Sequence, residues 1–298
     1  MAEVTSRPQR VLRTLEMVKL NPLMDRTAGV PDIAIGLIDG PVTLEHPDLV
    51  QERISAVPGK IAACAESEST SCMHGTAVAG ILTARRGSYA PAICPECRLL
   101  IRPIFPEIRM GDGHTPSATP KELAEAIVET ISAGARILNV SASLVEPSSP
   151  KDRVIERALD YAAQRGVIVV AAAGNQGLLG GTVITRHASV IPVVGCSLDG
   201  IPLKESNLGH SIGRRGLSSP GEGITSLGAD GQPRTFSGTS AAAPFVTGAI
   251  ALLWSLRPNA SAEEVKMAIT QPGQRTARNT LVPRLLDAWA AYQAMKVH

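Results

Sequence analysis

The sequence predicts an α/β fold of three layers, in which helices flank a central, mainly parallel β-sheet. Short runs that consist almost wholly of apolar residues are typical of strands buried on both faces, and they occur at residues 33–38, 137–140, 167–170 and 190–194. Longer segments with helical periodicity lie between these runs. Because strands that alternate with helices form βαβ units, the pattern indicates one parallel sheet with right-handed crossovers.

Three of the intervening segments begin with helix start signals. Thr119 and Glu122 form a capping box with Pro120 at the first helical position, and apolar residues then recur every fourth residue. Residues 149–152 and 261–264 open two further helices with comparable signals. These starts place helices on either side of the predicted strands.

The organisation of the chain favours a single domain. We find no internal repeat, low-complexity tract or linker, so we predict one domain over residues 31–298 behind an N-terminal extension of residues 1–30. A net charge of +2 and an aromatic content of 3% argue against nucleic acid as a partner. No apolar run suggests a membrane span, and the first ten residues lack the apolar region of a signal peptide. We therefore expect a cytoplasmic protein with no membrane partner.

Three short segments place a reactive side chain beside a strand end or a helix start. Asp39 ends the first predicted strand, and His74 leads a predicted helix start. Ser240 follows Gly238 and Thr239 and precedes a helix of small residues. Functional groups gather at the carboxyl ends of the strands in an open parallel sheet, so we expect these three side chains to meet.

The chemistry of acyl transfer requires these residue types. A serine hydroxyl is a poor nucleophile until a base removes its proton, and His74 is the candidate base for Ser240. A buried carboxylate such as Asp39 fixes the tautomer of the imidazole and stabilises its charged form. The oxyanion needs donors already in place, which the amide of Asn175 and the backbone N–H of Ser240 would supply. We predict Asp39, His74 and Ser240 as a catalytic triad and Asn175 as part of an oxyanion hole.

Four ordered motifs resemble the subtilisin family, the subtilases. They are Gly238-Thr239-Ser240-x-Ala242-x-Pro244, His74-Gly75-Thr76 with Val78-Ala79-Gly80, Ala172-Ala173-Gly174-Asn175, and His46-Pro47-Asp48-Leu49. The resemblance implies a subtilisin-like fold and a serine endopeptidase, a hydrolase that works without a cofactor. It leaves structural calcium or zinc open, because no calcium ligands are recognisable in the sequence.

The same resemblance implies an extended peptide substrate held between two strands. One wall corresponds to Ser141, Ala142 and Ser143, and the opposing edge corresponds to Gly111, Asp112, Gly113 and His114. Ala173, Gly174 and Thr239 are expected to line the same site. Departures from the usual family residues at Gly40-Pro41, Ala241, Phe245 and Ala142-Ser143 change the pocket walls, so substrate preference does not carry over.

A further resemblance is to the proteases that mature cyanobactin-like ribosomal peptides. It rests on Gly40-Pro41 followed by His46-Pro47, and on the cysteine pairs around the histidine motif. In that branch one member removes a leader peptide, and its macrocyclising partner carries a long insertion between Asp and His. The interval from Asp39 to His74 has no room for such an insertion, which favours peptide maturation by cleavage. A peptide ligase or macrocyclase and a catalytically silent peptide-binding fold are the alternatives.

Four cysteines flank the predicted histidine helix. Cys64 and Cys72 precede His74, and Cys94 and Cys97 lie in the loop after the helix. They form either two local disulfides or a four-thiolate zinc site. The family resemblance favours two disulfides, whereas a cytoplasmic location favours thiols or zinc. The fifth, Cys196, is expected to be a small buried apolar side chain.

Overall fold

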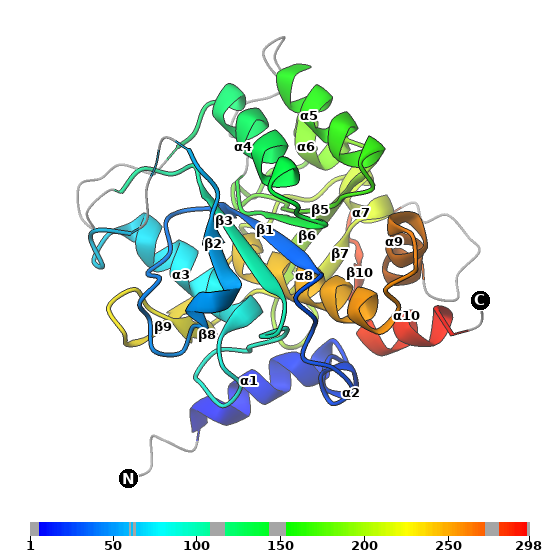
Figure 1. Cartoon of the computed structure of the whole chain (residues 1–298). Helices are drawn as coiled ribbons and strands as arrows, with labels where there is room; N and C mark the ends of the chain where they lie inside the picture. The colour runs from blue at the N-terminus through cyan, green and yellow to red at the C-terminus, as the bar shows by residue number, and fades with distance from the viewer. Residues whose placement is uncertain are drawn as a thin grey trace.

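The computed structural model describes residues 6–59, 61, 64–107, 117–142, 153–271 and 280–296 (Figure 1). Its centre is an eight-stranded sheet in the order β10-β7-β6-β5-β4-β1-β3-β2, in which each recorded strand pairing is parallel. The strands are β1 (Ala34–Asp39), β2 (Ile54–Ala56), β3 (Arg98–Pro103), β4 (Ile137–Val140), β5 (Ile168–Ala172), β6 (Val190–Cys196), β7 (Leu217–Pro220) and β10 (Arg284–Leu285). A separate antiparallel hairpin consists of β8 (Ile224–Leu227) and β9 (Pro233–Phe236).

Helices cover both faces of the sheet, which confirms the predicted three-layer α/β fold. One face carries α4 (Pro120–Ser132), α5 (Arg153–Gln164) and α6 (Val183–Arg186). The other carries α1 (Ser6–Met17), α2 (Asn21–Met24), α3 (Thr70–Thr83), α8 (Thr239–Leu256), α9 (Ala262–Thr270) and α10 (Ala288–Ala294). The short elements η1 (Gln51–Arg53) and α7 (His210–Arg215) complete the described structure.

Alternation along β1 shows how the sheet feeds two cores. Ile35 and Leu37 join the core around α3 and α8, whereas Ala34 and Ile38 join the core beneath α4 and α5. Side chains of a strand point to opposite faces in turn, so a strand covered on both faces must be apolar throughout. This is the reason the short apolar runs predicted the strands correctly.

The helix start signals mostly held, with one correction. Thr119 and Ser261 cap α4 and α9 through complete capping boxes, as predicted. Residues 149–152 lie outside the described residues. The histidine helix does not start at His74: α3 begins at Thr70 behind Ser69, so His74 lies in its second turn. Ser69 is the N-cap residue of α3, but its side chain forms no capping hydrogen bond. The residues at 69–71 therefore do not form the capping box that marks the start of α4 or α9.

The residues of the predicted N-terminal extension pack on the main body. Leu15, Leu20 and Leu23 are buried in the same core as α8. Lys19 also forms an ion pair with Asp287, 2.6 Å away at the start of α10. The first helices therefore contribute to the core that supports the site.

Helix α8 runs through the middle of the molecule. It packs against β4, β5, β6 and β7 and against α3. Among the described residues it is the one helix long and apolar enough to cross a membrane, and 89% of that stretch is buried inside the protein. A core helix enclosed on all sides has the same composition, because it needs no polar face.

One of the two expected disulfides is confirmed and the other is not formed. Cys64 and Cys72 form a disulfide with a Cα–Cα distance of 5.5 Å, whereas Cys94 and Cys97 are buried free thiols. The hydrogen bond between these two thiols and their burial raise the pKa of Cys94 well above its ordinary value, which keeps it protonated. Cys196 is a buried free thiol, as predicted.

Candidate active site

The structure brings Asp39, His74 and Ser240 together in one chain of hydrogen bonds. His74 Nε2 lies 2.8 Å from Ser240 Oγ, and His74 Nδ1 lies 2.6 Å from Asp39 Oδ1. Asp39 is the last residue of β1, His74 lies in α3, and Ser240 is the second residue of α8. Three elements far apart in the sequence thus meet beyond the carboxyl end of β1.

The surroundings of His74 raise its pKa above that of a histidine in water. Burial lowers the pKa of His74, but the charge of Asp39 and its hydrogen bond outweigh burial, and the net pKa is raised above 6.5. The Asp39 side chain is fully buried, whereas 32% of the His74 side chain is exposed. An accessible imidazole with a buried carboxylate behind it has the polarity that proton transfer from a serine requires.

The carboxylate of Asp39 is held asymmetrically. Its Oδ1 atom accepts a hydrogen bond from the backbone N–H of Gly40 at 2.6 Å in addition to the contact with His74. Its Oδ2 atom is buried and has no hydrogen-bond partner among the described residues. Asp39 therefore interacts with the imidazole of His74 through one oxygen atom, Oδ1.

Two glycines allow α3 to approach the end of β1. A side chain at Gly40 would overlap the backbone carbonyl of Ser71, and one at Gly75 would overlap the carbonyls of Gly40 and Pro41. This contact explains Gly40, which replaces the residue usual in the resembling family: here the position after Asp39 has no room for a side chain. Close backbone packing brings the helix that carries His74 to the carboxylate.

The nucleophile is connected to Asn175 through Thr239. The Oδ1 atom of Asn175 accepts hydrogen bonds from the Thr239 N–H and hydroxyl, both at 2.9 Å. The Thr239 hydroxyl in turn accepts from the Gly174 N–H at 3.2 Å. Because a backbone N–H must meet an oxygen, these contacts fix which branch of the amide is the nitrogen. The Asn175 amide nitrogen lies beside Gly238, at the start of the helix that carries Ser240.

The predicted substrate-contacting residues fall into three groups. Gly111, Asp112, Gly113, His114 and Ser143 lie outside the described residues. Ser141 is half-buried and Ala142 is buried directly after β4, next to the end of β1. Ala173, Gly174 and Thr239 are also buried, and Thr239 serves here to orient Asn175 and offers a substrate no surface.

Sequence reasoning missed an aromatic neighbour of His74 and a cleft lined in part by Met73, the residue before His74. Phe236 contacts the His74 ring edge-on, with centroids 5.7 Å apart. Arg234 stands two residues earlier on the same face of β9 and lines a cleft of about 810 Å³. The cleft is otherwise lined by Ala65, Glu66, Ser67, Glu68, Met73 and Asp230. The lining residues come from the loop at 65–68, from α3 and from the β8–β9 hairpin, and no sequence motif marks them.

A second missed contact connects the sheet to the nucleophile helix. Asn139 of β4 is fully buried, and its Oδ1 accepts a hydrogen bond from the Thr247 hydroxyl of α8 at 2.8 Å. Thr247 is buried as well. A buried polar pair of this kind fixes the position of α8 on the sheet.

The family comparison agrees with this geometry. The sequence model described as "Subtilase family" matches residues 31–284. The chain belongs to the subtilase family. Named relatives of this subtilase include mycosin-3 of Mycobacterium tuberculosis, which is 31% identical over 277 residues, and subtilisin Savinase of Lederbergia lenta, which is 27% identical over 223 residues. The match thus places most of the chain in a family that includes the named proteases above.

The extent of these matches differs between relatives. The match to mycosin-3 covers 73% of this subtilase but only 59% of the relative. The match to the alkaline protease of Alkalihalobacillus alcalophilus covers 89% of this chain and 65% of the relative. The match to subtilisin Savinase covers 74% of this chain and 76% of the relative. The chain thus spans about three fifths to three quarters of these relatives.

Solved structures match nearly the whole of this subtilase. The protease domain of PatA, in a point-mutant form, superposes with a TM-score of 0.80 at 31% identity and covers 90% of this chain and 97% of the other. The prenylagaramide maturation protease PagA gives a TM-score of 0.79 at 28% identity and covers 92% of this chain and 98% of the other. The PatG macrocyclase in complex with a peptide shares the fold at 21% identity, with a TM-score of 0.79 and coverage of 93% and 95%.

Proposed function

We propose that this subtilase is an endopeptidase that cleaves peptide bonds through Asp39, His74 and Ser240. The observation that carries the proposal is the unbroken hydrogen-bond chain from Ser240 Oγ through His74 to Asp39 Oδ1. The family membership of residues 31–284 supports the same reaction class.

The geometry supplies each step of acyl transfer. Ser240 Oγ attacks the scissile carbonyl while His74 Nε2 takes its proton, and Asp39 stabilises the resulting imidazolium. The oxyanion forms beside the Asn175 amide nitrogen and the backbone N–H of Ser240, which by its position near the start of α8 is one of the helix's unpaired donors. His74 then gives its proton to the leaving amine, and water hydrolyses the acyl-enzyme by the same steps in reverse.

The substrate we propose is an extended precursor peptide inside the cell. The support is the similarity of most of the chain to PatA and PagA, both of which are named as maturation proteases. The segment of half-buried Ser141 and buried Ala142 follows β4 and lies beside the end of β1, where a peptide would add to the edge of the site. Catalysis by this mechanism needs no cofactor.

The test is mass spectrometry of a peptide library after incubation with wild type, Ser240→Ala and Ser237→Ala. Loss of the nucleophile in a triad of this type costs on the order of a million-fold in kcat, so Ser240→Ala should give no products. Ser237 is the matched control, because it is exposed three residues away and accepts a hydrogen bond from Gly223. Ser237→Ala should cleave as the wild type does.

The products distinguish the alternatives. Linear fragments cut at a restricted motif support a processing endopeptidase and give its cleavage rule. Products lighter by one water than the linear peptide would replace the endopeptidase with a macrocyclase. Substantial turnover by Ser240→Ala would exclude this nucleophile, and no products from a wild type that binds peptide would indicate a silent binding fold.

A further inference from the structure

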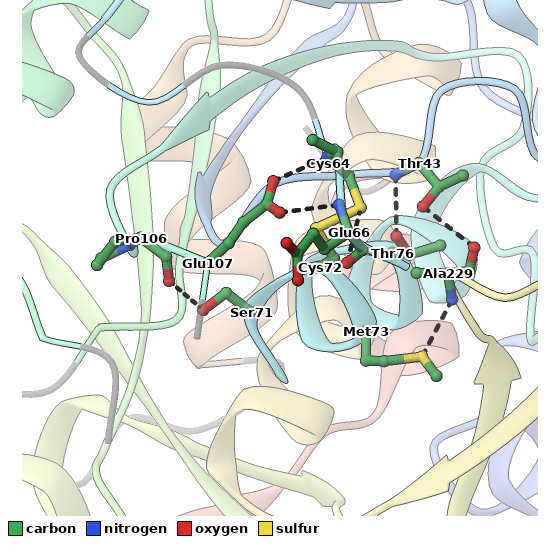
Figure 2. The surroundings of a disulfide bond; sticks show 11 residues. Thr43, Cys64, Glu66, Ser71, Cys72, Met73, Thr76, Pro106, Glu107 and Ala229 are labelled. Atoms are coloured by element: carbon green, nitrogen blue, oxygen red, sulfur yellow. Dashed lines mark hydrogen bonds between the residues drawn. A yellow bond between two sulfur atoms is a disulfide. The ribbon is translucent and has the colours of Figure 1, made fainter. Parts of the chain in front are cut away.

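Three metal-binding side chains gather beside the helix that carries His74. The sulfur atoms of Cys64 and Cys72 and a carboxylate oxygen of Glu107 all lie within 4.8 Å of one another. Among the described residues this is the only group of three or more His, Cys, Asp or Glu ligands so arranged, and Cys94 and Cys97 are not part of it. In the structure the two sulfurs are joined as a disulfide (Figure 2).

The carboxylate is held in place without the disulfide. Glu107 accepts hydrogen bonds from the backbone N–H groups of Ala65 and Glu66, each at 2.8 Å. A further hydrogen bond connects the segment that contains the two cysteines to the segment that contains Glu107: the Ser71 hydroxyl donates to the Pro106 carbonyl at 2.7 Å. Figure 2 shows Glu107 reaching across to the loop between the two cysteines. If the S–S bond opens, the three ligand groups still belong to segments bound to one another.

Opening the bond is an ordinary thiol–disulfide exchange. Two molecules of a small thiol of the glutathione class are oxidised to their own disulfide, and their two electrons and two protons convert Cys64 and Cys72 to thiols. Cys64 is only half-buried, which gives the attacking thiolate access, whereas Cys72 is fully buried. The product is a dithiol with a carboxylate at its side.

We propose that the reduced pair Cys64 and Cys72, with Glu107, binds a thiolate-preferring divalent cation of the zinc type. Two thiolates select such a cation over calcium or magnesium, which prefer oxygen ligands. Both thiol protons pass to solvent when the cation binds. The metal site exists only in the reduced state, so the disulfide and the bound metal are alternative cross-links between the same two residues.

The geometry fits with small movements. Zinc binds sulfur at about 2.3 Å and carboxylate oxygen at about 2.0–2.2 Å in a tetrahedron, which sets its ligand atoms roughly 3.5 Å apart. The carboxylate oxygen already lies within 4.8 Å of both sulfurs and would have to move in to about that separation, while the sulfurs move apart once they are no longer bonded. Water occupies the fourth position.

The site lies at the start of the helix that carries the candidate base. Cys72 lies two residues before His74 on α3, so either cross-link, the disulfide or the metal, anchors the first turn of this helix.

The experiment measures metal binding directly and needs no peptidase activity. The full chain is reduced with a phosphine, freed of reductant without air and titrated with Co²⁺, then with Zn²⁺, beside an oxidised sample. We expect the reduced protein to take up one more equivalent of Co²⁺ than the oxidised protein. A thiolate-to-cobalt charge-transfer absorption should appear and be removed by zinc.

Three variants assign the ligands. Cys64→Ser should abolish the additional equivalent. Glu107→Gln should weaken cobalt affinity at least about tenfold, because loss of even an outer partner of a ligand costs roughly 10–100-fold. Glu68→Gln is the matched control, since Glu68 is an acid of the same loop that lies outside the cluster, and its affinity should not change.

The result that overturns the proposal is equally direct. Equal cobalt uptake by reduced and oxidised wild type, or the same affinity in Glu107→Gln and Glu68→Gln, excludes this site. Cleavage assays on the same samples report on the peptidase separately, so failure of one proposal is not read as failure of the other.

Discussion

The active site has a nucleophile side, formed by Asn175, Thr239 and Ser240, and a base side, formed by Asp39 and His74. Hydrogen bonds between side chains and backbone set the geometry of the nucleophile side, whereas close packing of the backbone sets the geometry of the base side. Thr239 holds the Asn175 carbonyl oxygen through both its N–H and its hydroxyl. Among the described residues the side-chain carboxylate of Asp39 bonds only to His74 and Gly40, both through Oδ1, and its Oδ2 atom has no partner. What brings α3 to Asp39 is the close approach of Ser71 to Gly40.

The difference has a physical reason. Asn175 must present a fixed donor to a charge that exists only in the transition state, so its orientation has to be set beforehand. Asp39 has one task, to present a charge to one ring nitrogen, and further hydrogen bonds would spread that charge. The two sides should therefore fail differently when they are altered.

The largest expected effect in this comparison is that of Asp39→Asn on the base side. The amide group facing His74 Nδ1 would move the ring proton to Nε2, so that the imidazole no longer accepts the Ser240 proton. Such a change lowers kcat by about 10⁴-fold in a serine-protease triad, and we expect a loss of that order in a peptide-cleavage assay. Asp32→Asn, at an exposed position before β1, should leave kcat unchanged. A loss below tenfold would mean that Asp39 does not orient His74.

The pH dependence tests the same pair. Cleavage requires neutral His74, whose pKa is raised because Asp39 outweighs the effect of burial. The acid limb of kcat/KM in the wild type should therefore lie above pH 6.5. In Asp39→Asn only burial remains, which lowers the pKa, so the limb should move below pH 6.5. An acid limb at the same pH in both proteins would contradict the assignment of this shift to Asp39.

On the nucleophile side, Asn175→Ala should cost about 10²–10³-fold in kcat, the range found when one oxyanion donor is removed. KM should change little, because the donor acts mainly in the transition state. Steady-state kinetics with one peptide substrate separates the two quantities. A rise in KM with unchanged kcat would instead assign Asn175 to ground-state binding.

The sequence predicted the parts of this site that local chemistry marks. Asp39, His74, Asn175 and Ser240 each stand at a strand end or within a small-residue helical motif, and the structure places them together. Four of the eight strands of the sheet, β1, β4, β5 and β6, were predicted because burial on both faces makes them almost wholly apolar, whereas β2, β3, β7 and β10 were not predicted. The bounds of β4 match the prediction, but those of β1, β5 and β6 differ by one or two residues, and the last residues of β5 and β6 are small or polar and carry no distinct signal.

What the sequence could not predict depends on contacts between distant segments. Cys64 and Cys72 form a disulfide as expected, but Cys94 and Cys97, which had been equally compatible with one, are free thiols. The contact of Glu107 with the backbone at 65–66 joins segments some forty residues apart. A carboxylate that accepts from backbone N–H groups needs no particular sequence at the donor, so no pattern marks it.

The steric half of the comparison is tested by Gly40→Ala. The added methyl group would overlap the Ser71 carbonyl, and overpacking of this kind costs about 1–3 kcal/mol of the free energy of unfolding. Because α3 has to move away, kcat should fall together with stability. Urea denaturation and cleavage kinetics measure the two effects. Unchanged stability and unchanged kcat together would show that the contact at Gly40 does not position His74.

The smallest expected effect comes from Thr239→Val, which keeps the shape and removes the hydroxyl. The Gly174 N–H loses its acceptor and Asn175 Oδ1 loses the hydroxyl donor, while Asn175 Oδ1 retains the Thr239 N–H. Only the hydrogen bond to Asn175 orients the amide directly, and a single hydrogen bond contributes about 0.5–1.5 kcal/mol, so we expect kcat to fall roughly tenfold with KM unchanged. Thr239→Ser restores the hydroxyl and should restore kcat, which a merely structural role of the methyl group would not do. Equal kcat in the valine and serine variants would mean that Asn175 is oriented by the Thr239 backbone alone, and the nucleophile side would then depend on backbone contacts as the base side does.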